Sequence, residues 1–140
     1  MKKLFLISLS LIMSVTVSLA ETYTDDNGIT WTYSVNDDEV TITGAEGCGE
    51  TVVVPETIDG KNVTTLFETF NGNTTIKNVT VPASVTSIGS DTFRGCTRLL
   101  HVNGLSKCTE IGTFAFQGCT NLKTVDLFEC TTVHENPLTI

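Results

Sequence analysis

The stretch IGSDTFRGCTRL at residues 88–99 recurs as IGTFAFQGCTNL at residues 111–122. The offset between the two copies, 111 minus 88, also separates Phe70 from Phe93 and Gly72 from Gly95. A fixed period marks one structural unit that is used several times, so it decides the fold more firmly than local propensity does. We expect about three copies, the last of them incomplete.

A second pair of repeated residues, Cys108 and Cys130, recurs at the slightly shorter offset of 130 minus 108. Periods of about 20 to 29 residues are typical of leucine-rich repeats, in which each unit adds one strand to a parallel ladder with strands about 4.8 Å apart. Val79, Val102 and Val125 hold the strand positions. The sequence therefore predicts a β-rich leucine-rich-repeat solenoid with short helical or 3-10 turns, in which the phenylalanine of each Phe-x-Gly-Cys turn is buried.

The residues before the repeats have a different pattern. Residues 29–35 alternate apolar and polar side chains, residues 36–39 favour a turn, and residues 40–43 alternate again, which predicts a β-hairpin. We expect Trp31 and Tyr33 to pack on the next element. The predicted organisation is an N-terminal β-hairpin cap and lead-in strand over residues 21–60, followed by leucine-rich repeats over 61–140.

One repeat carries a recognisable family signature. The string VTVPASVTSIG at residues 79–89, with the Phe-x-Gly-Cys turn that follows, closely resembles the BspA-like leucine-rich repeat. Residues 53–64 resemble the lead-in that precedes the first repeat in such proteins. The next unit has NGL at residues 103–105, where the family pattern has a strand residue and proline. The resemblance implies a secreted or surface protein, and several family members are adhesins.

Residues 1–20 are predicted to be a signal peptide. Lys2 and Lys3 give a positive start, residues 4–17 are mainly apolar, and residues 18–20 are small enough for cleavage before Glu21. The alternative is a membrane anchor, but the apolar stretch is shorter than the roughly 20 residues that span a bilayer, and no charged stop-transfer segment follows. We expect a secreted or cell-surface protein, without membrane insertion after cleavage.

Charge is concentrated in the first third of the expected mature chain. Residues 21–60 contain ten acidic residues and no lysine or arginine, so the mature net charge is 6 minus 16, or −10. Nucleic acid binding requires a basic footprint, so we expect no nucleic acid partner. Residues 25–28, Asp-Asp-Asn-Gly, could suggest a calcium loop, but the ligand spacing and distal glutamate of an EF-hand are missing. We interpret the acidic residues as a solvated surface.

Few residues of this chain are suited to catalysis. The two histidines, His101 and His134, lie in no catalytic motif; we expect His101 on an outward strand position and His134 in a frayed end. We therefore predict no enzymatic activity, no cofactor and no metal.

The five cysteines are Cys48, Cys96, Cys108, Cys119 and Cys130. Their spacing lacks the close pairs of a zinc site. Disulfides suit an exported protein, yet the cysteines recur at repeat positions that small apolar core residues also hold. We interpret them as free buried thiols, with disulfides as the alternative.

The predicted binding surface lies on the ladder of repeated strands. Inward-pointing side chains alternate with outward-pointing ones along each strand. The inward set is Val79, Val81, Val102, Val125 and Leu127, and the outward candidates are Asn78, Thr80, His101, Asn103, Thr124 and Asp126. We expect this surface to bind an extracellular protein of the host matrix or of a microbial surface. The alternative is a structural envelope or coat component that assembles through stacked solenoids.

Overall fold

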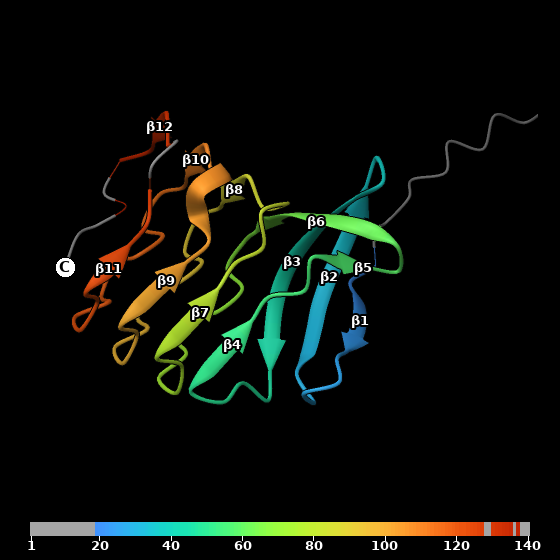
Figure 1. Ribbon diagram of the computed structural model, residues 1–140, viewed down its shortest axis with the longest axis horizontal. Helices are drawn as coiled ribbons and strands as arrows, with labels where there is room; N and C mark the ends of the chain where they lie inside the picture. Colours follow the sequence, from blue (N-terminus) through green and yellow to red (C-terminus); the bar gives the residue numbers. More distant parts are fainter. Residues whose placement is uncertain (1–18, 128–129, 136, 138–140) are drawn as a thin grey trace, which may run out of the picture.

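The structure is a computed structural model, and it describes residues 19–127, 130–135 and 137. The predicted signal peptide, residues 1–20, lies almost entirely outside the described residues. The described chain forms a β-solenoid, in which two ladders of strands wind around a common apolar core (Figure 1). The leucine-rich-repeat solenoid that the sequence predicts is confirmed.

One sheet, here called the long sheet, combines the N-terminal hairpin with one strand from each turn of the solenoid. Its strands are β1 (Glu21–Thr24), β2 (Thr30–Asn36), β3 (Glu39–Glu46), β6 (Lys61–Leu66), β8 (Ser87–Ile88), β10 (Glu110–Ile111) and β12 (Thr132–Val133), in that order, with β5 (Thr57–Ile58) paired to β6. From β3 onward each of these strands runs parallel to the next, whereas β5 is antiparallel to β6.

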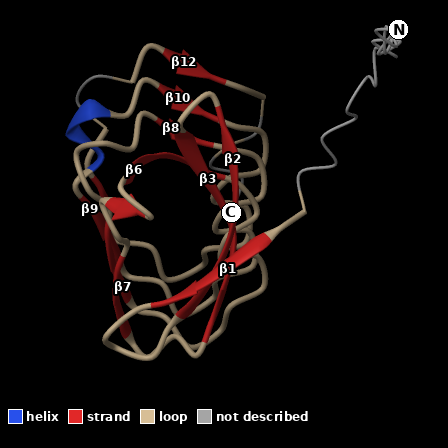
Figure 2. Cartoon of the chain, turned by 90° about the vertical axis from the view of Figure 1, so that its right-hand side faces the viewer, coloured by secondary structure: helices blue, strands red, loops and turns tan. Residues whose placement is uncertain are grey.

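The second sheet, here called the short ladder, consists of four parallel strands. They are β4 (Thr51–Val53), β7 (Asn78–Thr80), β9 (His101–Asn103) and β11 (Thr124–Val125). The view along the solenoid shows the two sheets on opposite sides of the core (Figure 2). One 3-10 turn, Leu105–Lys107, joins β9 to β10.

The N-terminal hairpin forms as the sequence predicts and covers the first end of the long sheet. β2 and β3 pair antiparallel, and β1 adds a further antiparallel strand that the sequence did not indicate. Trp31 is completely buried, and its ring meets Phe70 of the first repeat edge-on at 6.2 Å between centroids. The Tyr33 hydroxyl donates to Asp59 Oδ2 at 2.6 Å, and this contact together with burial raises the Tyr33 pKa. The hairpin is thereby packed onto the repeats.

A column of stacked phenylalanines runs along the core. Phe70, Phe93 and Phe116 occupy the same position in three successive turns, and their ring centroids are 5.3 and 5.2 Å apart. Each ring is at most 2% exposed. Such offset-stacked pairs stabilise a core beyond the area that they bury. The repeat period seen in the sequence therefore corresponds to one turn of the solenoid.

Two glycines permit the close stacking of successive turns. Gly104 has a φ of 89°, and a side chain there would overlap the carbonyl of Val81 in the preceding turn. This contact explains why a glycine stands at residue 104, where the repeat pattern has a strand residue. Gly112 has no unusual φ, but a Cβ on it would overlap the backbone of Ser90. Both positions therefore exclude larger residues for steric reasons.

The five cysteines are free thiols in the structure, and the predicted burial holds for three of them. Cys96 Sγ donates to the carbonyl of Phe70 at 3.0 Å, and Cys119 Sγ donates to that of Phe93 at the same distance. Cys108 is also buried, whereas Cys48 and Cys130 are half-buried. The neighbouring Cys119 thiol and burial raise the pKa of Cys96 above its ordinary value, and burial raises that of Cys108. These thiols act as core residues.

Candidate functional site

The short ladder brings most of the predicted outward residues into alignment. Asn78 of β7 is paired in register with His101 of β9, which in turn is paired with Thr124 of β11. Thr80 is paired with Asn103 in the same way. Two rows of polar side chains therefore run across the strands, at right angles to the chain direction. Five of the six predicted residues belong to these rows.

A buried row of valines lies between the two polar rows. Val52, Val79 and Val102 are in register and completely buried, so the alternation of the strands points their neighbours outward. Val125 continues this row, but it is only half-buried because β11 is the last strand of the ladder. The predicted inward residues Val79 and Val102 thus have the expected role.

Asp126 is the predicted residue that does not join the rows. β11 ends at Val125, so Asp126 lies one residue beyond the paired segment and is half-buried. The inward residue predicted beside it, Leu127, is half-buried as well. Leu127 still packs against the core as predicted, so it is the regular strand pairing that stops before Asp126.

The lead-in strand predicted from the sequence forms as β4, but the sequence did not indicate that it is the first strand of this surface. Thr51 of β4 is in register with Asn78, and Val53 is in register with Thr80. Val53 is 57% exposed, so it adds an apolar side chain to an otherwise polar row. The interval from Thr51 to Asn78 is longer than the repeat period, and this spacing hides the strand from a search for repeats. The short run of valines before Pro55 predicts the strand but does not show which strand it pairs with.

Charged and polar contacts hold the side chains of this surface. The carboxylate of Glu50, just before β4, lies 2.7 Å from Lys77 Nζ and 3.3 Å from Arg98 Nη2. The hydrogen bond from Lys77 lowers the pKa of Glu50. His101 Nδ1 lies 2.7 Å from Thr124 Oγ1, which links two strands across the first row. The surface therefore presents hydrogen-bonding groups on a regular and continuous framework.

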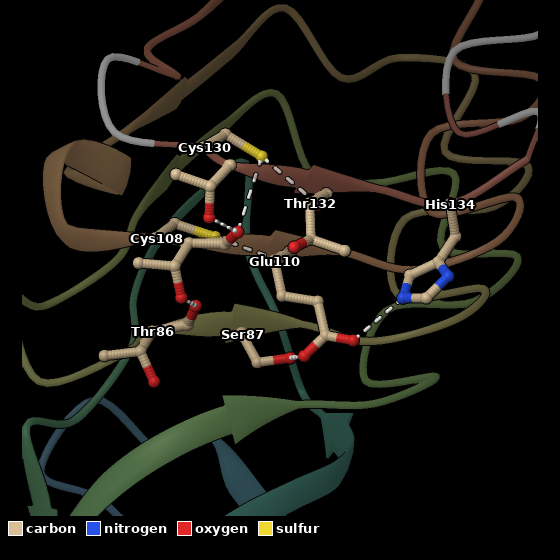
Figure 3. A network of polar contacts seen from close by, with 9 residues as sticks. Thr86, Ser87, Cys108, Glu110, Cys130, Thr132 and His134 are labelled. Carbon is tan, nitrogen blue, oxygen red and sulfur yellow. Dashed lines mark hydrogen bonds and ion pairs between the residues drawn. The ribbon is translucent and has the colours of Figure 1, made fainter.

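A hollow of about 410 Å³ opens on the opposite side, over the long sheet. Glu110 is one of the residues that line this hollow, and Figure 3 shows its contacts: Ser87 Oγ donates to Glu110 Oε2 at 3.4 Å, and His134 Nε2 lies 2.9 Å from Glu110 Oε1. The carboxylate thus stands between the hydroxyl and the imidazole. In the serine-histidine-carboxylate arrangement of hydrolases, the imidazole takes the proton from the serine hydroxyl. Here the imidazole instead contacts the carboxylate, an arrangement that does not prepare Ser87 for attack.

His134 forms hydrogen bonds to the preceding turn that the sequence did not indicate. It was expected in a frayed end, but its N–H donates to the carbonyl of Ile111 at 2.9 Å and its ring contacts Glu110. The sequence signal for this contact is weak, because the strands of the long sheet in this region are very short.

The acidic loop at residues 25–28 has a structural role. Asp25 Oδ1 accepts hydrogen bonds from the N–H groups of Asn27 and Ile29, and Oδ2 accepts one from Trp31 Nε1. Both carboxylate oxygens are thus used to close the turn that starts β2. Within the described residues, no group of three or more histidine, cysteine, aspartate or glutamate side chains could hold a metal ion.

Comparison with known proteins gives the family. A family model described as "BspA type Leucine rich repeat region (6 copies)" matches residues 61–137, which is more than half of the chain. The chain belongs to this family. As a BspA-type protein it carries the matched repeats beside an N-terminal hairpin that lies outside the match. No curated protein matches the sequence.

Two solved structures resemble this BspA-type chain. A leucine rich cell surface protein from Faecalibacterium prausnitzii is 27% identical with a TM-score of 0.70, and the alignment covers 82% of this chain and 33% of that one. The leucine rich repeat protein of T. pallidum is 34% identical with a TM-score of 0.63, covering 66% of this chain and 44% of that one. The chain thus spans a third to less than half of the length of these proteins.

These findings support a repeat module of the kind found in bacterial surface proteins. Within the described residues, no helix has the length and apolar character needed to cross a membrane.

Proposed function

We propose that the protein binds an extracellular protein partner through the outer surface of the short ladder and has no catalytic role. The observation that carries this proposal is the pair of polar rows, aligned in register over a buried row of valines. A flat and regular surface of this kind suits contact with an extended partner. The name of the F. prausnitzii structure, a cell surface protein, agrees with a position outside the cell.

The composition of the surface indicates modest affinity. Tight interfaces are usually anchored by tryptophan, tyrosine and arginine, whereas the two rows consist of threonine, asparagine, histidine and one valine. We therefore expect a dissociation constant of roughly micromolar for a single copy. The acidic residues at 21–60 favour a basic partner, and association should weaken as salt screens their charge.

The proposal is tested by adding the same charge to two surfaces. Mature protein is first measured against immobilised matrix proteins and microbial-surface protein fractions. The combined variant His101→Lys and Asn103→Lys, on the short ladder, should then weaken binding about tenfold or more, which corresponds to about 1.4 kcal/mol. The matched control, Asn71→Lys and Gln117→Lys, places two lysines on the Phe-x-Gly turns. Loss of binding in the control with full binding in the ladder variant would show that the other face is used.

A second candidate function is assembly of like solenoids into an envelope or coat layer. It is favoured by Val133, which continues the buried row of Ile88 and Ile111 in the long sheet but is 55% exposed. Exposed apolar side chains at the last strand of a sheet favour association with another strand. Sedimentation at several protein concentrations separates the two functions, since only assembly predicts species that grow with concentration.

A further inference from the structure

β4 forms one end of the short ladder, and one of its two edges is paired with β7. On the paired edge, Asn78 N–H donates to the carbonyl of Glu50 at 3.0 Å, and Val54 N–H donates to the carbonyl of Thr80 at 2.9 Å. In a parallel pair, alternate residues of a strand turn both backbone groups toward the same neighbour. The backbone groups of residues 50, 52 and 54 on this edge are therefore directed toward β7.

The other edge of β4 carries backbone groups without a strand partner in the described part of the chain. By the same alternation, Thr51 and Val53 direct their N–H and C=O groups away from β7. This leaves two donors and two acceptors in a row along the strand. Unpaired strand edges of this kind accept a further strand when one is offered.

A hollow lies beside this free edge. Its volume is about 340 Å³, and its lining consists of Asn27, Ile29, Gly47, Gly49, Thr51 and Val53. The two residues of β4 in this lining are the same two that the alternation assigns to the free edge. A Cβ added to Gly49 would meet no atom within 4 Å, so the glycine leaves the space open. The hairpin covers the first end of the long sheet, through the pairing of β3 with β6, but it adds no strand to β4.

We propose that an extended, basic segment of a protein partner adds to the free edge of β4 as a fifth strand of the short ladder. Main-chain hydrogen bonds to Thr51 and Val53 would hold the segment, in the mode known as β-augmentation. This inference rests on the proposed function, because it names the part of the binding surface where a partner strand enters. It also gives the exposed Val53 side chain a cross-strand neighbour.

The acidic residues near the hollow favour a partner segment with positive charge. Asp26 and Glu46 are exposed and directly precede Asn27 and Gly47 in the lining of the hollow. The nearby carboxylate of Glu50 is already neutralised by its two basic neighbours, whereas Asp26 and Glu46 form no ion pair within the described residues. A segment with lysine or arginine beside a small apolar residue matches both these two acidic residues next to the lining and the exposed Val53.

The test uses a short capped peptide in which valine and lysine alternate, and it follows backbone amide exchange by NMR in the whole mature protein. In the free protein, the Thr51 and Val53 amides should exchange rapidly while the Val52 and Val54 amides are protected. Saturating peptide should slow exchange at Thr51 and Val53 about tenfold or more. The same peptide methylated on alternate backbone nitrogens keeps its charge but cannot pair, and it should bind at least about tenfold more weakly.

A variant of the protein tests peptide binding at the hollow independently of the exchange experiment. Gly49→Leu fills the hollow without a backbone clash, so it should abolish peptide binding while the protein stays folded. The matched control Asn71→Leu adds the same side chain at an exposed position elsewhere and should leave binding unchanged.

Four results would overturn the inference. Equal protection of Val52 and Val53 in the free protein would show that the edge is already paired. Equal binding of the methylated peptide would show that main-chain bonds are not used. Protection that rises with protein concentration in the absence of peptide would show that a second copy occupies the edge. If partner binding is lost in the His101→Lys and Asn103→Lys variant but kept in Gly49→Leu, the proposed function stands and this inference fails.

Discussion

The phenylalanine column allows a quantitative test of the solenoid register. Phe93 is the central ring, completely buried and stacked on Phe70 at 5.3 Å and on Phe116 at 5.2 Å. Replacement of a buried phenylalanine by alanine typically costs about 3 to 5 kcal/mol, through lost transfer free energy and the cavity that remains. Each stacked pair contributes about 0.5 to 1.5 kcal/mol beyond buried area. Because Phe93→Ala removes two stacked pairs, we expect the free energy of unfolding to fall by about 4 to 5 kcal/mol, near the upper end of that range.

Phe116→Ala removes only the pair with Phe93, so we expect a smaller loss of about 3 to 4 kcal/mol. Both losses are a large share of the roughly 5 to 15 kcal/mol that stabilises a typical domain. The control is Phe67→Ala, since that side chain is 40% exposed and its removal should cost less than about 1 kcal/mol.

Urea denaturation measures these differences directly. With an m-value of about 2 kcal/mol/M, Phe93→Ala should lower the unfolding midpoint by about 2 M, and Phe67→Ala by less than about 0.5 M. A midpoint for Phe93→Ala equal to that of the Phe67→Ala control would refute the reasoning. A larger loss for Phe116→Ala than for Phe93→Ala would contradict the assigned order of the rings.

Three further predictions concern stacking, thiols and pH. Gly112→Ala should destabilise the fold by about 1 to 3 kcal/mol because its Cβ overlaps the Ser90 backbone, whereas Gly49→Ala should be close to neutral in the same denaturation assay. Denatured protein should be alkylated at Cys96, Cys108, Cys119 and Cys130 without prior reduction, and mass spectrometry that finds Cys96 joined to Cys119 would disprove the free thiols. Lys77 lowers the pKa of Glu50, so the stabilisation from this exposed pair is present above the ordinary value of 4.5 and is lost as pH falls through the lowered pKa. Glu50→Gln should remove this part of the pH dependence, and an unchanged pH profile of the urea midpoint in the variant would count against the assignment.

Much of the solenoid could be predicted because its period is visible in the chain. Repeated phenylalanine, glycine and cysteine positions report contacts that recur in every turn, and the hairpin is local in sequence. Val79 and Val102 have the expected buried positions for the same reason.

The remainder depends on contacts that local patterns do not encode. Between β4 and β7 the chain forms the antiparallel pair of β5 and β6. This insertion makes the interval from β4 to β7 longer than the repeat period, so the repeat pattern does not place β4 on the surface. Asp126 fails to join because β11 stops at Val125, where the ladder has no further strand to pair with in the described chain. The contact between His134 and Glu110 joins two successive turns through strands that are too short to show alternation.

The two histidines provide the most direct test of the binding face, because they lie on opposite sides of the solenoid. His101 belongs to the short ladder, and His134 lines the hollow over the long sheet. Histidine modification by diethyl pyrocarbonate, read by mass spectrometry with and without a protein partner found in the binding assay, reports on both at once. We predict that the partner slows modification of His101 and leaves that of His134 unchanged. Protection of His134 with unchanged modification of His101 would contradict the proposed binding surface.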